Sequence, residues 1–210
     1  MAYVLGLIYA DGAVEDVRKS SRTCYVTLTS KDESLLEQVK DLLSSTHKLY
    51  RNKQQLRRFR NGKFYLCKEN FILRIGNKIL YQDLVNLGLK PRKSLVMSLP
   101  NVSPRYFNYF LRGYFDGDGC ISVSYIKGQK GPRLKTIFTG GSRVFLNSLS
   151  LKLNALIGTT PKKVYRNGYA FRLGYGKKDS MNLLLYMYKK LNGVPYLRRK
   201  HEIYRKFLAN

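Results

Sequence analysis

The spacing of apolar and polar residues predicts two series of elements that follow one another in the same order. Apolar residues recur at helical spacing in some segments and alternate with polar residues in others. The first series consists of a helix over 2–11, a strand pair ending at 24–29, a helix opened by Ser30-x-x-Glu33 as a capping box, a hairpin around Asn61-Gly62, and a helix over 78–87. The second consists of a helix over 105–118, strands within 120–139, a helix over 142–157, a hairpin at Asn167-Gly168, and a helix over 179–191. Each series predicts an α+β unit with an antiparallel sheet.

Sequence identities between the two series indicate an internal repeat. The segment VLGLIYADG at 4–12 returns as LRGYFDGDG at 111–119, an offset of 107 residues. Two shorter matches follow, FRNG at 59–62 with YRNG at 165–168, and RIG at 74–76 with RLG at 172–174. We expect two halves related by an approximate dyad, over residues 1–89 and 105–210, with a proline-containing linker at 90–104.

The helix that opens each half carries small residues four positions apart, Gly6 and Ala10 in the first half, and Gly113 and Gly117 in the second. Glycine inside a helix costs about 1 kcal/mol relative to alanine. That cost is understandable if two helix backbones must approach closely. These stripes therefore predict that the two repeated helices pack against each other and form the interface between the halves.

Each repeated helix ends in an aspartate, Asp11 or Asp118, followed by glycine. A carboxylate is disfavoured at a helix C-terminus because the helix dipole is negative there. A dyad would bring two such carboxylates together, and a divalent cation with a preference for oxygen ligands, such as Mg²⁺, would relieve the repulsion. Metal ions held in this way can activate water and stabilise the leaving oxygen of a phosphodiester. A single Asp-Gly pair is more often only a turn, but two copies on matching helices favour the chemical interpretation.

The net charge narrows the class of partner. The chain of 210 residues has 39 Lys and Arg against 13 Asp and Glu, a formal net charge of +26. Between residues 119 and 178 there is no acidic residue, and a second basic run spans residues 48–63. An excess of this size indicates a polyanionic partner, most simply nucleic acid.

The composition also excludes several classes of protein. With 44% hydrophobic residues the chain can bury a core, so it is not a disordered basic tail. We expect an intracellular protein, because there is no apolar run long enough for a membrane span and no secretory leader. Three cysteines without CxxC spacing do not predict a zinc ribbon, and two histidines are poorly placed for a Ser-His-Asp triad. Hydrolytic chemistry would therefore depend on carboxylates.

At the two repeated strings, over 4–12 and 111–119, the chain resembles the LAGLIDADG homing endonucleases in their single-chain form with two motifs. The resemblance implies two αββαββα halves whose antiparallel sheets form a saddle on double-stranded DNA. It also implies cleavage of both strands of a long pseudo-palindromic site, leaving short 3′ overhangs. A monomer would then suffice. Mg²⁺ is the implied cofactor, with Mn²⁺ expected to substitute and Ca²⁺ expected to bind without supporting cleavage.

Carried over by position, Asp11 and Asp118 resemble the metal-binding catalytic acids, and the carbonyls of Ala10 and Gly117 resemble auxiliary ligands. Three lysines are further candidates for positioning water or stabilising the transition state. They are Lys31, whose counterpart in the second half is Gly141, and Lys93 and Lys200, which follow the closing helices. For each lysine, a solvated side chain or a phosphate contact is an equal alternative. Tyr9 departs from the motif at a position that caps or packs in the family, so cleavage is still expected.

Alternation along the strands also predicts which residues contact DNA. Arginine suits the edges of guanine, whereas lysine more often contacts phosphate. The predicted contacts are Tyr25, Thr27, Thr29, Arg51, Arg58, Arg60, Lys63 and Arg74 in the first half, and Lys127, Arg133, Lys135, Lys163, Arg166 and Arg172 in the second.

Three alternatives remain open on the sequence alone. The first is a maturase that binds its host intron RNA and assists splicing on the same fold. The second is a DNA-binding regulator that does not cleave, although the loss of one acid would then be expected and both are present. A basic RNA-binding protein of the ribosomal type is a more distant third. The sequence also leaves open whether the chain is a free-standing reading frame, an intein domain or part of a longer protein.

Overall fold

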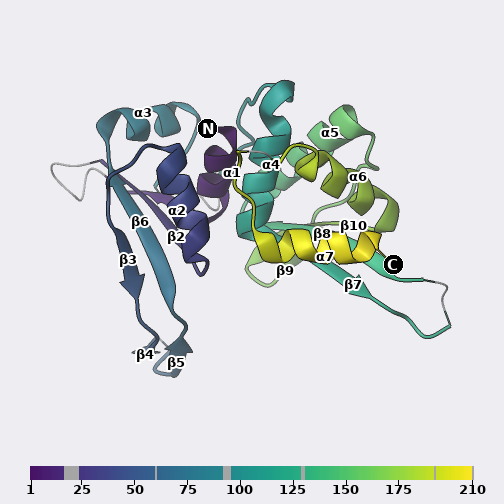
Figure 1. The fold of residues 1–210 in the computed structure, drawn as a ribbon, viewed down its shortest axis with the longest axis horizontal. Helices are drawn as coiled ribbons and strands as arrows, with labels where there is room; N and C mark the ends of the chain where they lie inside the picture. The colour runs from purple at the N-terminus through teal and green to yellow at the C-terminus, as the bar shows by residue number, and fades with distance from the viewer. Residues whose placement is uncertain (17–23, 60, 92–95, 129–130, 192, 210) are drawn as a thin grey trace.

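A computed structural model describes residues 1–16, 24–59, 61–91, 96–128, 131–191 and 193–209. It shows two α+β halves side by side, each with a four-stranded antiparallel sheet, and the helices α1 and α4 lie between them (Figure 1). The strand orders, β1-β2-β6-β3 and β7-β8-β10-β9, correspond to each other. The αββαββα fold is therefore confirmed.

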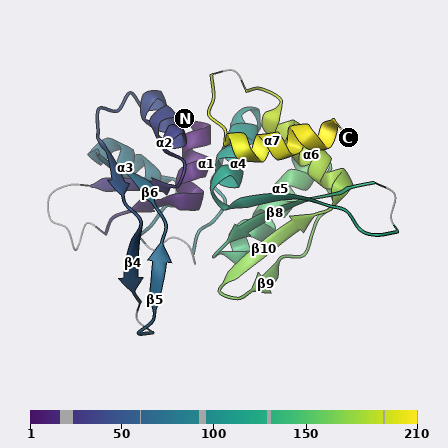
Figure 2. The ribbon, with the colours of Figure 1, turned by 60° about the horizontal axis from the view of Figure 1, so that its bottom comes forward.

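The first half contains more strands than the repeat predicts. Its elements are α1 (Ala2–Asp11), β1 (Gly12–Val14), β2 (Tyr25–Ser30), α2 (Glu33–Leu42), β3 (Leu49–Asn52), β4 (Gln55–Arg58), β5 (Phe64–Cys67), β6 (Asn70–Gly76) and α3 (Lys78–Asn86). Strands β4 and β5 form a separate two-stranded sheet that projects away from the body of the half (Figures 1 and 2).

The second half contains one helix more than the repeat predicts. Its elements are α4 (Pro104–Asp118), β7 (Gly119–Ser124), β8 (Arg133–Gly140), α5 (Arg143–Ile157), β9 (Tyr165–Asn167), β10 (Ala170–Tyr175), α6 (Lys177–Tyr188) and α7 (Arg198–Leu208). Helix α7 packs beside β7, close to the end of α4 (Figure 1). The extended hairpin of this half joins β7 to β8, not the strands that correspond to β3 and β6 (Figure 2).

Helices α1 and α4 approach so closely that their glycines have no room for a side chain. A Cβ atom added to Gly6 would overlap the carbonyl oxygen of Phe110, and one added to Gly113 would overlap that of Tyr3. At Gly117 an added Cβ would overlap the Cβ of Ala10. The small-residue stripes thus lie at the interface between the halves. Because α1 is covered on most sides, six of its residues are buried, and aromatic rings of both halves meet around it.

The strand pairing corrects two of the three repeat matches. Arg51 pairs with Phe71, and Arg166 pairs with Phe171, in equivalent places of the two sheets. The YRN of β9 at 165–167 therefore corresponds to the YRN at 50–52, and FRNG at 59–62 lies in the inserted hairpin instead. By the same register Arg74 corresponds to Gly174, and not to Arg172, since the offset between β6 and β10 is 100 residues.

Three predicted local motifs also differ in detail. Helix α2 begins at Glu33 with Asp32 as its N-cap, while the Ser30 hydroxyl accepts a bond from the Asp32 N–H, so there is no capping box. In the β4–β5 hairpin the N–H of Phe59 donates to the carbonyl of Lys63, so Asn61-Gly62 is not a two-residue turn between paired strands. In the β9–β10 hairpin Asn167 pairs with Ala170, which makes Gly168, at φ 62°, the first turn residue.

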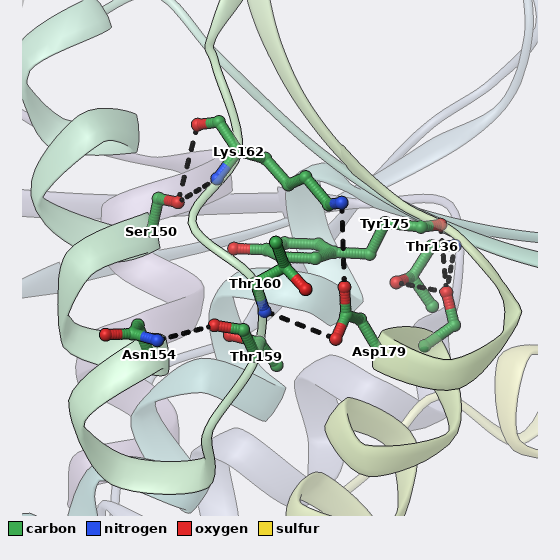
Figure 3. Close-up of polar contacts among 9 residues, drawn as sticks. Thr136, Ser150, Asn154, Thr159, Thr160, Lys162, Tyr175 and Asp179 are labelled. Carbon is green, nitrogen blue, oxygen red and sulfur yellow. Dashed lines mark hydrogen bonds and ion pairs between the residues drawn. The ribbon is translucent and has the colours of Figure 1, made fainter.

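A buried polar cluster fixes the loop that leads from α5 into β9 (Figure 3). The backbone N–H of Thr160 donates to Asp179 Oδ1 at 3.3 Å, and Lys162 Nζ lies 3.8 Å from Asp179 Oδ2. The N–H of Lys162 donates to the Ser150 hydroxyl at 2.9 Å. These contacts join the helical layer to the loop and so set the position at which Lys163 and the strand after it emerge.

Candidate functional site

The two motif aspartates end their helices and lead directly into strands. Gly12 and Gly119 follow them with φ of −84° and −89°, an extended backbone that any residue adopts. Glycine is required here for space, because an added Cβ would lie 2.7 Å from the Ile8 carbonyl oxygen at Gly12 and would overlap the Phe115 ring at Gly119. The Asp-Gly pairs are therefore not the left-handed caps typical of helix ends. They place each carboxylate at the junction of helix and sheet.

The carboxylates of Asp11 and Asp118 lie on either side of the interface between the halves. Asp11 Oδ2 would be 2.9 Å from a Cβ atom on Gly117, the residue before Asp118, so Asp11 reaches across to the opposite helix. Burial, reinforced by the charges of Asp118 and Asp11, raises the pKa of Tyr114 well above its usual range. The charges of both carboxylates therefore act on the Tyr114 hydroxyl, which supports their placement as a pair.

A cavity of ≈ 370 Å³ opens beside Asp11 and contains residues of both halves. Its lining includes Lys31 and Asp32, from the turn before α2, and Arg199 of α7. Arg199 Nε is 3.7 Å from Asp32 Oδ2, an ion pair between the two halves. The structure therefore brings Lys31 together with Asp11, as the sequence suggested, and adds an arginine from the other half.

Lys200 is not among the residues that line this cavity. Its side chain is buried, and its ammonium donates to the carbonyls of Asp116 at 2.9 Å and Gly119 at 2.6 Å, and also to that of Phe115. Burial lowers the pKa of Lys200 to about 8, although the nearby Asp116 opposes the shift. All three ammonium protons are thus engaged at the end of α4. Lys200 therefore fixes this helix end, and its predicted role in positioning water or stabilising the transition state stays a prediction.

Asp116 and Arg112 extend this buried cluster along α4. Asp116 Oδ2 accepts bonds from the Tyr3 hydroxyl at 2.8 Å and from the Leu197 N–H at 2.9 Å. Burial raises the pKa of Asp116 to about 6, and the bond from Tyr3 and the charge of Lys200 oppose that shift. Arg112 donates to the carbonyls of Met187 and Lys190, both at 2.9 Å. The cluster joins the opposite half, through Tyr3, to the segments around α6 and α7.

The outward face of the first sheet carries most of its predicted DNA contacts. Val26 and Leu28 are buried, whereas Thr27 faces outward directly opposite Arg74, with Tyr25 and Thr29 on the same face. Arg74 lies 3.8 Å above the Tyr25 ring and is bonded to Glu15 at 2.7 Å. Arg74, the one basic residue among these four, is thus already paired with an acid of the same half.

The second sheet presents an equivalent outward face. Arg172 is directly opposite Thr139 on it, and Lys135 and Arg133 follow at alternate positions of β8. Leu134, between them, is buried. Lys127, in the β7–β8 hairpin, and Lys163, before β9, are exposed.

Two predicted contacts lie on the opposite side of their sheets. Arg51 and Arg166 are directly opposite Phe71 and Phe171, and directly paired residues point to the same face, the helical side. Arg51 accordingly bonds Glu69 at 2.7 Å, and the acid of Glu33 on α2 contributes to its raised pKa. Neither arginine therefore belongs to the outward surface.

The remaining predicted bases divide between the inserted hairpin and segments outside the described residues. Arg58 and Lys63 are exposed in and next to the β4–β5 pair. Arg60 and Lys93 lie outside the described residues. Sequence analysis missed Arg199, because helix α7 has no counterpart in the first half to show that residue 199, and not residue 200, faces the cavity.

The donors near the two aspartates are oxygens. No group of three or more His, Cys, Asp or Glu side chains that could hold a metal occurs among the described residues, where all three cysteines are free. Two carboxylates and nearby main-chain carbonyls fit a hard cation such as Mg²⁺, which completes its coordination with water or phosphate oxygens. Gly117 is not one of the residues whose carbonyls Lys200 occupies. Within the described chain no helix is long and apolar enough to cross a membrane.

Comparison with known proteins gives a consistent family and fold. A family model described as a LAGLIDADG-like domain matches residues 1–82 and 107–206. The homing endonuclease I-LtrWI bound to target DNA is similar with a TM-score of 0.59 at 14% identity, covering 99% of this chain and 88% of that one. I-CpaMI bound to uncleaved DNA gives 0.59 at 13% identity, with 99% and 89% covered, and DNA-bound I-WcaI gives 0.57 at 14%, with 96% and 84% covered.

One curated protein is also similar in sequence. It is the reverse gyrase of Methanocaldococcus jannaschii, 25% identical over 210 residues, with 95% of this chain covered. The chain spans 11% of the length of that protein.

Proposed function

The chain belongs to the LAGLIDADG-like domain family, and on this premise we propose that it is a site-specific endonuclease that cuts both strands of double-stranded DNA. The observation that carries the proposal is the placement of Asp11 and Asp118 at paired helix ends, across an interface too close for any side chain at Gly6 or Gly113. The outward face of the second sheet carries Arg133, Lys135 and Arg172, that of the first carries Arg74 among polar and aromatic residues, and solved structures with this fold have DNA bound. A single chain supplies both halves, so we propose that it acts as a monomer.

The two acids would hold Mg²⁺ with the help of the Ala10 and Gly117 carbonyls. When bound, the metal would supply activated water and charge stabilisation for the leaving 3′-oxygen. The chain itself orients the phosphate. Lys31 and Arg199 line the cavity beside Asp11, where positive charge would attract the scissile phosphate and stabilise negative charge that develops on it. Because each half contributes one acid, one cut in each strand with short 3′ overhangs is the expected product.

Sequence recognition would come from the outward sheet faces. Arg172, Lys135 and Arg133 on one side, and Thr27 with its neighbours on the other, are spaced along strands that can lie in the major groove. Main-chain and lysine contacts to phosphate would add affinity without selectivity and make binding sensitive to salt.

The proposal is tested by incubating the protein with Mg²⁺ and a plasmid library containing a randomised insert. Linearised plasmids are sequenced at both ends. We expect one recurrent site, cut in both strands with 3′ overhangs. Cleavage without a recurrent site, or binding without cleavage in Mg²⁺ or Mn²⁺, would contradict the proposal.

A further inference from the structure

The β4–β5 hairpin exposes several large apolar side chains to solvent. Leu56 is 63% exposed, Leu66 58% and Phe64 61%, although all three lie in regular strands. Phe59 is 50% and Tyr65 47% exposed near the turn, with their rings 5.1 Å apart. A two-stranded hairpin by itself is only marginally stable in water. Exposed apolar side chains of this size, gathered in one place, are typical of a binding surface.

The strand register places three of these side chains, Leu56, Phe64 and Leu66, on one face. Leu56 is directly opposite Leu66, and Arg58 is directly opposite Phe64. Because alternate residues of a strand share a face, these four side chains lie together, while Arg57 and Tyr65 form the other face. The face is thus an apolar strip with an arginine beside it.

The charge around this strip identifies the kind of partner. Between residues 53 and 68 the sequence has six Lys or Arg and no Asp or Glu. Positive charge on both sides of an apolar strip suits a nucleic acid groove, which has phosphate on both sides. The apolar group that a DNA major groove offers is the C5-methyl of thymine.

We propose that the hairpin recognises thymine. Leu56, Phe64 and Leu66 pack against C5-methyl groups in the major groove, while the flanking lysines and arginines contact the phosphates. This inference rests on the proposed function, because it assigns a preference within the same DNA target. It also places the specificity of this segment in apolar contacts, whereas alternation along the strands predicted only polar, aromatic and basic ones.

The test compares duplexes that differ only in methyl groups. The site recovered from the library is synthesised with thymine, and again with deoxyuridine at each thymine of one half, which removes the C5-methyl and leaves the base pairing. Equilibrium binding is measured in Ca²⁺. We expect binding about fourfold weaker for each contacted methyl removed, on one half of the site only.

Variants of the chain assign the effect to the strip. In Leu56→Ser, Phe64→Ser and Leu66→Ser combined, thymine and deoxyuridine duplexes should bind equally, with unchanged melting temperature because these side chains are exposed. Leu151→Ser on α5, where the leucine is 64% exposed, is the matched control and should keep the preference.

Several results would overturn the inference. Equal binding of both duplexes by the wild type would do so, as would a preference that survives in the triple variant. Self-association that depends on Leu66, measured by sedimentation, would show that the strip binds a second copy instead. A recurrent cleaved site that is insensitive to uracil would refute thymine recognition while leaving the nuclease intact. Failure to recover any cleaved site would instead refute the proposed function.

Discussion

The two halves make an equivalent hydrogen bond with different side chains, Tyr9 in the first half and Asp116 in the second. Each lies two positions before the motif aspartate and ties its helix to the segment that follows the closing helix of its half. The Tyr9 hydroxyl donates to the Leu87 carbonyl at 2.6 Å, whereas Asp116 accepts from the Leu197 N–H at 2.9 Å. The contact is retained while donor and acceptor exchange roles. What the fold requires at this position is therefore a bond across this gap, and not a particular residue.

The second half uses more buried charge than the first. Asp116, Arg112 and Lys200 are all buried in it, whereas Tyr9 makes its bond as a neutral phenol. Buried charges are costly to desolvate, and removing one member leaves the others uncompensated. We therefore expect the second half to be the more sensitive to single substitutions and to pH.

The halves also differ beside the motif aspartates. Lys31 and Asp32 lie in the cavity near Asp11, but their counterparts by register are Gly141 and Ser142, and the Ser142 hydroxyl is bonded to the Met97 carbonyl at 2.6 Å. Helix α7 also contributes Arg199 to the cavity beside Asp11. A symmetric backbone thus carries two different chemical environments.

The largest stability effect is expected where the halves are most alike, at the paired glycines. Gly113→Val would force a side chain into the Tyr3 carbonyl and should cost at least about 3 kcal/mol in the free energy of unfolding. Denaturant titration measures this. Gly176→Ala is the control, since nothing lies within 4 Å of an added Cβ there, and it should cost less than about 1 kcal/mol. Equal costs would show that α1 and α4 are not in close contact.

The next effect separates the two equivalent ties. Lys200→Met should destabilise the protein by roughly 2 to 4 kcal/mol, because three carbonyls at the end of α4 lose their donor and Asp116 loses a nearby positive charge. Tyr9→Phe removes one neutral bond and should cost about 1 kcal/mol. Chemical denaturation of both variants at one pH measures the two losses of unfolding free energy. A larger loss in Tyr9→Phe than in Lys200→Met would contradict this prediction.

A pH effect should come from the second half. Because burial raises the pKa of Asp116 to about 6, above its unfolded value, the folded state holds this proton more tightly. The resulting stability is fully present below pH 4 and is lost as pH rises through 6, a change on the order of 3 kcal/mol. The free energy of unfolding of the wild type and of Asp116→Asn is measured across this pH range. The stability of the wild type relative to the variant should fall as the pH rises from about 4 through 6. A constant difference would contradict the raised pKa of Asp116.

The smallest stability effect should accompany a clear loss of activity. Arg199 is exposed, and its pair with Asp32 at 3.7 Å should contribute less than about 1 kcal/mol. Arg199→Gln should nevertheless slow cleavage of target DNA roughly 100-fold if its charge stabilises the transition state. Single-turnover rates and melting curves on the same preparation distinguish this from Lys200→Met. Unchanged cleavage by Arg199→Gln would remove this residue from the site.

The sequence predicted the features that repeat and missed those that do not. Gly6 and Gly113 indicated the helix interface, because glycine destabilises a helix by itself and suits a helix whose backbone touches another. Alternation placed Thr27 and Arg74 on one face correctly, since Val26 and Leu28 on either side of Thr27 are strongly apolar. Helix α7 and the β4–β5 insertion occur in one half only, so the repeat could not predict either.

Register and local context explain the remaining errors. FRNG at 59–62 resembles YRNG at 165–168 in letters, but pairing to Phe71 and Phe171 selects YRN at 50–52 instead. The one-residue parity of a strand then turned Arg51 and Arg166 to the helical face. For Lys200, spacing after a helix could not show that its ammonium points inward, since that depends on how α7 packs beside β7.

The central claim is that Asp11 and Asp118 perform the cleavage and do not merely end their helices. The direct test is the double variant Asp11→Asn and Asp118→Asn, assayed on the recovered target for both binding and cutting. We predict wild-type melting temperature, binding in the same concentration range, and cleavage of both strands in Mg²⁺ slowed by about 1000-fold or more. Cleavage at the wild-type rate by a folded, DNA-bound double variant would contradict the account.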